Sequence, residues 1–127
     1  MRPGKSSVRV IGMGNTYRGD DAIGLHVARA IGKRLPDVDI VAGVADGTAL
    51  LELWSGVELC LLVDCAVSGS TPGTVHSFDG LAQEIPAGLF SSFSTHAFSI
   101  PQSIELGRAL DRLPDRLLVY AVEGSNF

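Results

Sequence analysis

The chain has 127 residues, with ten lysines and arginines against fourteen aspartates and glutamates and a formal net charge of −4. A chain of this length has room for one domain with one hydrophobic core. The acidic balance, without a basic run that could neutralise several phosphates, argues against nucleic acid as a partner.

Neither membrane insertion nor secretion is expected. The longest apolar stretch, residues 57–67, contains Glu58 and Asp64 and is far shorter than the ~20 residues that a bilayer-spanning helix needs. No apolar segment with a small-residue cleavage site follows the amino terminus. We therefore expect a cytoplasmic protein.

The first half of the chain predicts a strand, a glycine turn and a helix, followed by a second strand and a short helix. Residues 8–11 are the expected first strand, and residues 20–35 carry apolar residues at helical spacing until Pro36 forces a stop. The second strand is expected over residues 39–42 and the short helix over residues 48–54.

The second half begins with an apolar run without alternation, residues 59–63, which is typical of a central parallel strand covered on both faces. The connection from there to a fourth strand over residues 74–78 is too short for a parallel crossover, so this strand should be antiparallel. Residues 79–95 show little periodicity and predict a long loop, a feature that is often functional.

The last elements are a helix and a strand. Residues 99–102 fit a capping box with proline in the first turn, and the helix that follows carries apolar residues as far as Leu113. Residues 117–122 predict the fifth strand. The whole of residues 1–127 is therefore expected to form one α/β domain, an open, mostly parallel five-stranded sheet with one antiparallel strand and helices on both faces.

The two cysteines, Cys60 and Cys65, lie five residues apart on what reads as one extended strand. At ~3.3 Å per residue their Cα atoms are roughly 16 Å apart, beyond the limit of about 7 Å for a disulfide. The chain has no CxxC motif, so zinc fingers and dithiol redox motifs are excluded. We expect Cys60 to be a small buried hydrophobic residue.

Several common signatures are absent. A dinucleotide-binding glycine turn would need glycine at position 17, where the chain has Tyr17. Gly14 and Gly19 have the separation of a phosphate-binding P-loop, but Asp20 and Asp21 follow in place of lysine and serine or threonine. Neither HExxH nor GxSxG occurs.

Polar residues at the ends of the expected strands remain as candidates. Asp64 closes the most apolar strand, Asp20 and Asp21 follow the turn after the first strand, and His96 lies between the long loop and a helix. Each has a plain alternative, since the acids could cap helices or turns and the histidine could be structural. If they converge, two carboxylates and an imidazole suit a divalent transition metal with open positions for substrate. The other two histidines, for which we expect ordinary surface or edge positions, are His26 and His76.

Short phrases spread over the chain carry a family resemblance. They are IGMGN at 11–15 with RGDDAIG at 18–24, VDCA at 63–66 with PGTV at 72–75, STH at 94–96, and YAVEG at 120–124. In this order and spacing they resemble the hydrogenase maturation endopeptidases over essentially the whole chain.

The resemblance implies an enzyme that recognises nickel in the precursor of a nickel-iron hydrogenase large subunit and removes a short carboxyl-terminal extension. It also implies that Asp21, Asp64 and His96 are the residues that contact the metal and serve catalysis. The nickel would come with the substrate, other divalent metals would be able to replace it in vitro, and the partner would be the large-subunit precursor. An alternative from another functional class is a non-catalytic metal-binding or chaperone module on the same fold.

The chain departs from the resemblance in two places. Many members carry the phrase DGGTxG after the second strand, whereas residues 45–50 read ADGTAL. Members also usually continue beyond the fifth strand into a terminal helix, so the chain reads as truncated. Three expected helices cannot cover five strands, and residues 117–122 are apolar on both faces. We expect bare apolar sheet surface there, and self-association through it.

Overall fold

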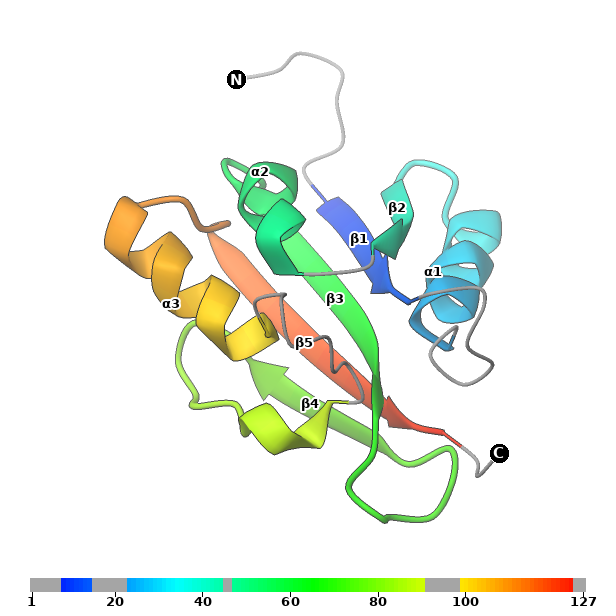
Figure 1. Ribbon diagram of the computed structural model, residues 1–127. Coiled ribbons are helices and arrows are strands. Elements are labelled where there is room, and N and C mark those ends of the chain that lie inside the picture. Colours follow the sequence, from blue (N-terminus) through cyan, green and yellow to red (C-terminus); the bar gives the residue numbers. More distant parts are fainter. Residues whose placement is uncertain (1–7, 15–22, 45–46, 91–98, 125–127) are drawn as a thin grey trace.

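The computed structural model describes residues 8–14, 23–44, 47–90 and 99–124. Within these ranges the chain forms one sheet with helices packed on both of its faces (Figure 1). No helix among these residues has the length and apolar character needed to cross a membrane.

The sheet confirms the predicted fold class. Its strands are β1 (Val8–Met13), β2 (Asp39–Val44), β3 (Leu59–Ala66), β4 (Val75–Asp79) and β5 (Arg116–Glu123), arranged in the order β2-β1-β3-β5-β4. β1 pairs in parallel with β2 and β3, and β3 pairs in parallel with β5. β4 is antiparallel to β5 at the edge of the sheet, as its short connection predicted.

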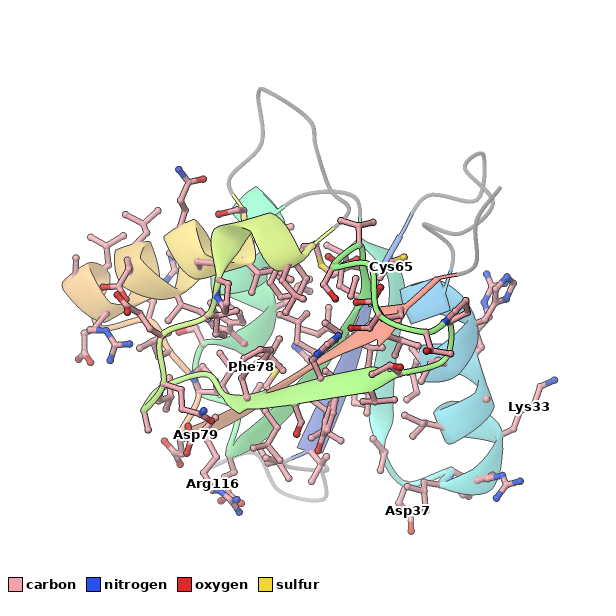
Figure 2. All side chains as sticks on the ribbon, turned by 90° about the horizontal axis from the view of Figure 1, so that it is seen from below. Lys33, Asp37, Cys65, Phe78, Asp79 and Arg116 are labelled. Carbon is pink, nitrogen blue, oxygen red and sulfur yellow. The ribbon has the colours of Figure 1, made fainter. Side chains whose placement is uncertain are left out.

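The helical elements are α1 (Ile23–Arg34), the 3-10 turn η2 (Gly47–Ala49), α2 (Leu50–Trp54), the 3-10 turn η3 (Ala87–Leu89) and α3 (Ile100–Leu110). α1 lies on one face of the sheet, over β1, β2 and β3. α2, α3 and η3 lie on the other face, as the view along the sheet shows (Figure 2). Helical elements therefore cover β1 and β3 on both faces of the sheet.

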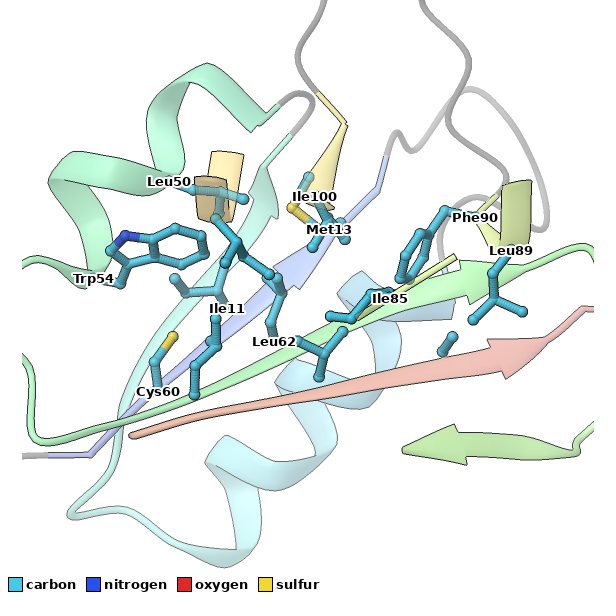
Figure 3. Close-up of a cluster of buried hydrophobic side chains, with 14 of the residues drawn as sticks. Ile11, Met13, Leu50, Trp54, Cys60, Leu62, Ile85, Leu89, Phe90 and Ile100 are labelled. Carbon is cyan, nitrogen blue, oxygen red and sulfur yellow. The ribbon is translucent and has the colours of Figure 1, made fainter. Parts of the chain in front are cut away.

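The main hydrophobic core lies between the sheet and the layer formed by α2, α3 and η3 (Figure 3). Alternate residues of the central strands, such as Ile11 and Leu62, point into it, and Trp54 from α2 is fully buried there. The indole nitrogen of Trp54 donates a hydrogen bond of 2.8 Å to the carbonyl oxygen of Arg112. This bond satisfies the polar end of the ring and ties α2 to the segment after α3.

The sequence-based limits of most elements change by a few residues, and three of these changes bear on the argument. β3 continues to Ala66 because β5 pairs with it up to Glu123, so Asp64 lies inside the strand and does not close it. The short helix is a 3-10 turn that becomes α2. α3 begins with the predicted capping box, in which Ser99 and Gln102 exchange hydrogen bonds, but it ends at Leu110, where Asp111 is left-handed.

The face of β5 that lies opposite the main core is only partly covered by the described residues. Leu117, Val119 and Ala121 are buried, whereas the alternating apolar residues between and after them stay half-exposed; these are Leu118, Tyr120 and Val122. Val75 on the neighbouring strand β4 has 56% of its surface exposed. The described residues therefore leave part of the apolar surface of β4 and β5 uncovered, and the expected self-association through it stays a prediction.

The first turn of α1 packs directly on the backbone of the two central strands at Gly24. A Cβ atom at this position would lie 2.2 Å from the carbonyl oxygen of Met13 and 2.5 Å from that of Val63. Both neighbours are backbone atoms, so relief requires the helix to move. Glycine therefore allows α1 to approach the ends of β1 and β3.

We predict that Gly24→Ala lowers the free energy of unfolding by about 1–3 kcal/mol, the usual cost of overpacking, although alanine is the better helix former. The matched control is Gly88→Ala, because a Cβ atom there meets nothing within 4 Å. Urea unfolding followed by circular dichroism measures both variants. Equal stabilities of the two variants would contradict the close approach of α1.

Candidate functional site

The strand order places a topological switch point between β1 and β3. From β1 the chain passes to β2 on one side of β1, and it then enters β3 on the other side. In open α/β sheets, ligands bind outside the carboxyl ends of the strands at such a point, because the connections diverge there and leave a crevice. The arrows of β1, β3 and β5 all end at this edge of the sheet (Figure 1).

Asp64 is the predicted site residue that the structure describes. It lies on β3 opposite Ala121 of β5, two residues before the end of the strand, with 4% of its surface exposed. Its Oδ1 atom accepts a hydrogen bond of 2.7 Å from the backbone N–H of Cys65. Figure 2 shows Cys65, its chain neighbour, at the opposite end of the sheet from Arg116, where β5 begins. Burial of a carboxylate is costly, which makes Asp64 a strong candidate for a functional role.

Asp21, and with it the neighbouring Asp20, lies outside the described residues, but both flanks of the segment 15–22 are described. On one side, the backbone N–H of Gly14 donates to the carbonyl oxygen of Val44 at 2.9 Å. On the other side, Gly24 packs against the ends of β1 and β3. The segment that contains Asp21 therefore begins and ends at the edge of the sheet where Asp64 lies.

His96 also lies outside the described residues, within the segment 91–98. The chain enters this segment from Phe90, which forms a bridge with Ala66 at the end of β3. It leaves the segment at Ser99, the N-cap of α3. The hydroxyl of Ser103 in the first turn of α3 donates a hydrogen bond of 2.9 Å to the carbonyl oxygen of Gly47, which follows β2. Both flanks of the His96 segment thus meet the carboxyl edge of the sheet.

Of the three predicted site residues, Asp64 alone lies in the described part of the chain. Among the described residues, no group of three or more His, Cys, Asp or Glu side chains is arranged to hold a metal ion. Asp21 and His96 would have to complete such a group around Asp64. The convergence of Asp21, Asp64 and His96 therefore stays a prediction that the described flanks of their segments support.

Cys60 is a poor candidate for a catalytic or metal-binding role. Cys60 and Cys65 are both buried, and neither forms a disulfide. Burial raises the pKa of the Cys60 thiol to about 12, so it stays protonated at neutral pH and is a poor nucleophile or metal ligand. The prediction that Cys60 is a small buried hydrophobic residue is confirmed.

Comparison with known proteins shows to which family the chain belongs. The family model described as hydrogenase maturation protease matches residues 25–126. The chain belongs to this family. The match begins after Asp21 and includes Asp64 and His96.

Individual relatives agree with the family assignment. The hydrogenase 2 maturation protease of Escherichia coli is 29% identical in an alignment of 119 positions that covers 91% of this chain and 71% of that protein. The solved structure of the hydrogenase maturating endopeptidase HybD from E. coli superposes with a TM-score of 0.71 at 25% identity, over 91% of this chain and 73% of that one. The [NiFe] hydrogenase maturation protease HycI from Thermococcus kodakarensis has the same fold, with a TM-score of 0.65 at 22% identity over 98% and 78% of the two chains.

Sequence reasoning missed one polar cluster of this protease. Glu123 ends β5, has 3% of its side chain exposed, and accepts a hydrogen bond of 2.9 Å from Nε2 of His76 on β4. The backbone N–H of Ser68 donates to the same carboxylate oxygen at 3.1 Å, and the Ser68 hydroxyl donates to it as well. His76 lies on the edge strand β4, as expected, but the expectation missed its bond to Glu123. His26 is exposed on α1, as expected.

A signal for Glu123 was present in the sequence. Residues 117, 119 and 121 are apolar and lie on one face of β5, and position 123 continues that face with an acid. An acid at a buried position of a strand requires donors nearby. The donors come from the connection after β3 and from β4, and no local pattern in the sequence indicates which residues those are.

The hydrogen bond from the Ser68 hydroxyl, assisted by that from His76, holds the pKa of the Glu123 carboxyl below its usual range although burial opposes the shift. A carboxyl whose pKa is lower in the folded state stabilises the fold above its unfolded pKa of about 4.3. That stabilisation is lost as the pH falls through the lowered folded value.

We therefore predict that Glu123→Gln lowers stability at pH 7 and that the difference from the unsubstituted chain shrinks on acidification below about pH 4. Urea unfolding at a series of pH values measures this difference. Glu105→Gln, at an exposed carboxylate on α3, is the control. A difference that stays constant between neutral and acid pH would contradict the role of the Glu123 charge.

Proposed function

We propose that this protease recognises nickel in the precursor of a nickel-iron hydrogenase large subunit and removes the precursor's carboxyl-terminal extension. The observation that carries the proposal is the burial of Asp64 at the switch point between β1 and β3, together with the family of the chain. A buried acid at this position is suited to meet a ligand that enters from the carboxyl edge of the sheet.

The proposed site consists of Asp21, Asp64 and His96. Carboxylate oxygens and an imidazole nitrogen form a donor set that suits divalent nickel and leaves positions open for the substrate's own ligands. Nickel bound in the precursor would then mark the polypeptide as ready for processing, and as a Lewis acid it can polarise a carbonyl group. In this proposal a carboxylate of the protease acts in the aspartic manner. It accepts a proton from the water that attacks the peptide carbonyl carbon and passes this proton to the nitrogen that leaves when the C–N bond breaks. Other divalent metals with similar ligand preferences are expected to replace nickel in vitro.

The non-catalytic alternative is not favoured. The family model and the named relatives are all proteases or endopeptidases, and none is described as a chaperone or a metal-storage protein. We also place the reaction in the cytoplasm, because neither Cys60 nor Cys65 forms a disulfide, which fits a reducing compartment.

The central test is processing of a nickel-loaded large-subunit precursor, followed by mass spectrometry of the shortened product. We expect Asp64→Asn and His96→Ala each to reduce the rate by at least about 100-fold, because each removes a metal ligand or a proton acceptor. Circular dichroism should show a folded chain in both cases, since neither change removes apolar contacts from the core.

Two variants of the same chemical kind serve as controls. Asp115→Asn changes an exposed acid before β5 begins, and His26→Ala changes an exposed histidine on α1. Both should process the precursor at the rate of the unsubstituted chain. Normal processing by Asp64→Asn or by His96→Ala would contradict the assignment of the site. Precursor that stays uncut by the unsubstituted chain would contradict the proposed function.

We further propose that the chain self-associates through the partly covered face of β4 and β5. Burial of apolar surface contributes roughly 25 cal/mol per Å², so a few hundred Å² per partner is worth several kcal/mol. The residues available for this contact are the half-exposed apolar side chains of β5 and the exposed Val75.

Analytical ultracentrifugation tests this contact directly. We expect a dimer at micromolar concentration that Tyr120→Lys dissociates, because the substitution places a charge in an apolar contact. Leu110→Lys is the control, since Leu110 is an exposed leucine on α3, outside this face. A chain that sediments as a monomer at all concentrations would contradict the proposal.

A further inference from the structure

Glu123 holds a charge at a place where the sheet itself does not require one. The other residues of β5 on the same face, Leu117, Val119 and Ala121, are apolar and buried. An apolar side chain at position 123 would continue this pattern without the desolvation cost of a carboxylate, and such replacements of buried charges are often neutral or stabilising. The groups that Glu123 binds therefore explain a charge at this position better than the packing of the sheet does.

These groups fix both ends of the connection between β3 and β4, residues 67–74. The Glu123 carboxylate binds the backbone N–H and the hydroxyl of Ser68 at the start of the connection. The backbone of Glu123 accepts from the N–H of Gly73 at 2.9 Å and donates to the carbonyl oxygen of Thr74 at 2.8 Å, at the end of the connection. His76, the second residue of β4, binds the same carboxylate oxygen. Glu123 thus binds both ends of the connection, and we call residues 67–74 the clamped connection.

The clamped connection lies at the edge of the sheet that holds Asp64. It leaves β3 directly after Ala66, which pairs with Glu123, and its first residue, Val67, donates a backbone hydrogen bond of 2.8 Å to Leu89 in the segment that leads towards His96. Figure 1 shows this connection at the end of the sheet where the arrows of β3 and β5 point. Val67 has 51% of its surface exposed, and residues 68–73 are exposed as well.

We propose that the connection 67–74 is part of the surface on which the precursor polypeptide docks, and that Glu123 is the positioning residue that holds this surface in its binding shape. The inference rests on the proposed function, because it takes the precursor as the partner. The exposed hydroxyls and backbone groups of the connection offer hydrogen bonds to a polypeptide, and Val67 offers an apolar contact. A surface fixed before binding loses less conformational entropy when the partner arrives.

The test compares KM and kcat for the nickel-loaded precursor in Glu123→Gln and Ser68→Ala with those of the unsubstituted chain. Loss of one hydrogen bond to a charged group corresponds to a factor of about ten, so we expect KM to rise about tenfold in Glu123→Gln. The rise should be smaller in Ser68→Ala, which keeps the backbone N–H bond. We expect kcat to stay within about twofold, because neither side chain takes part in the chemical step. Ser68→Ala should add nothing to Glu123→Gln, since both act on one hydrogen-bond network.

Glu105→Gln and Ser55→Ala are the matched controls, at an exposed position of α3 and at the end of α2, and both should leave KM unchanged. A lower melting temperature with an unchanged KM in both test variants would show a merely structural role and overturn the inference. If Glu123→Gln does not fold, Ser68→Ala, at an exposed residue, decides the question in the same way. Precursor left uncut by the unsubstituted chain would overturn the proposed function and this inference together, whereas normal cleavage with unchanged KM values overturns the inference alone.

Discussion

The parallel pairing of β3 with β1 on one side and β5 on the other is the constraint on which the rest of the structure depends. Parallel strands bring their carboxyl ends to one edge, so this pairing gathers the ends of three strands and the connections that leave them. The absence of a side chain at Gly24 lets α1 close against the same edge. The pairing of the backbones alone places Asp64 and Glu123 at this edge. It also places there the residues that flank the segments 15–22 and 91–98.

Local sequence patterns predicted most of this arrangement. The unbroken apolar run of β3 identified a central strand, the short connection after it identified an antiparallel neighbour, and Ser99 with Gln102 identified the start of α3. The patterns did not predict that β3 continues past Asp64. That extension comes from pairing with β5, a contact between residues about sixty positions apart that no local pattern can encode. The hydrogen bonds from Ser68 and His76 to Glu123 went unpredicted for the same reason.

Two buried acids at the carboxyl edge of the sheet have different environments. Glu123 receives hydrogen bonds from a hydroxyl, a backbone N–H and an imidazole, so its charge is balanced by neighbours of fixed position. Asp64 accepts from the backbone N–H of the next residue, a local bond that orients its carboxylate within β3. A carboxylate held by three donors is suited to hold structure, and a buried carboxylate at a switch point lies where ligands bind in open α/β sheets.

The alternation of side chains along β5 separates the two surfaces of functional interest. Asp64 pairs with Ala121, which belongs to the main core beneath α2 and α3, so both residues lie on that face of the sheet. Tyr120 and Val122 point to the opposite face, where the described elements leave apolar surface exposed. A partner that covers this second face gains hydrophobic burial without contacting the face that holds Asp64 and Glu123. The proposed self-association would therefore use the face of the sheet opposite Asp64 and Glu123, and the apolar pattern of β5 on both of its faces is compatible with the proposed active site on one of them.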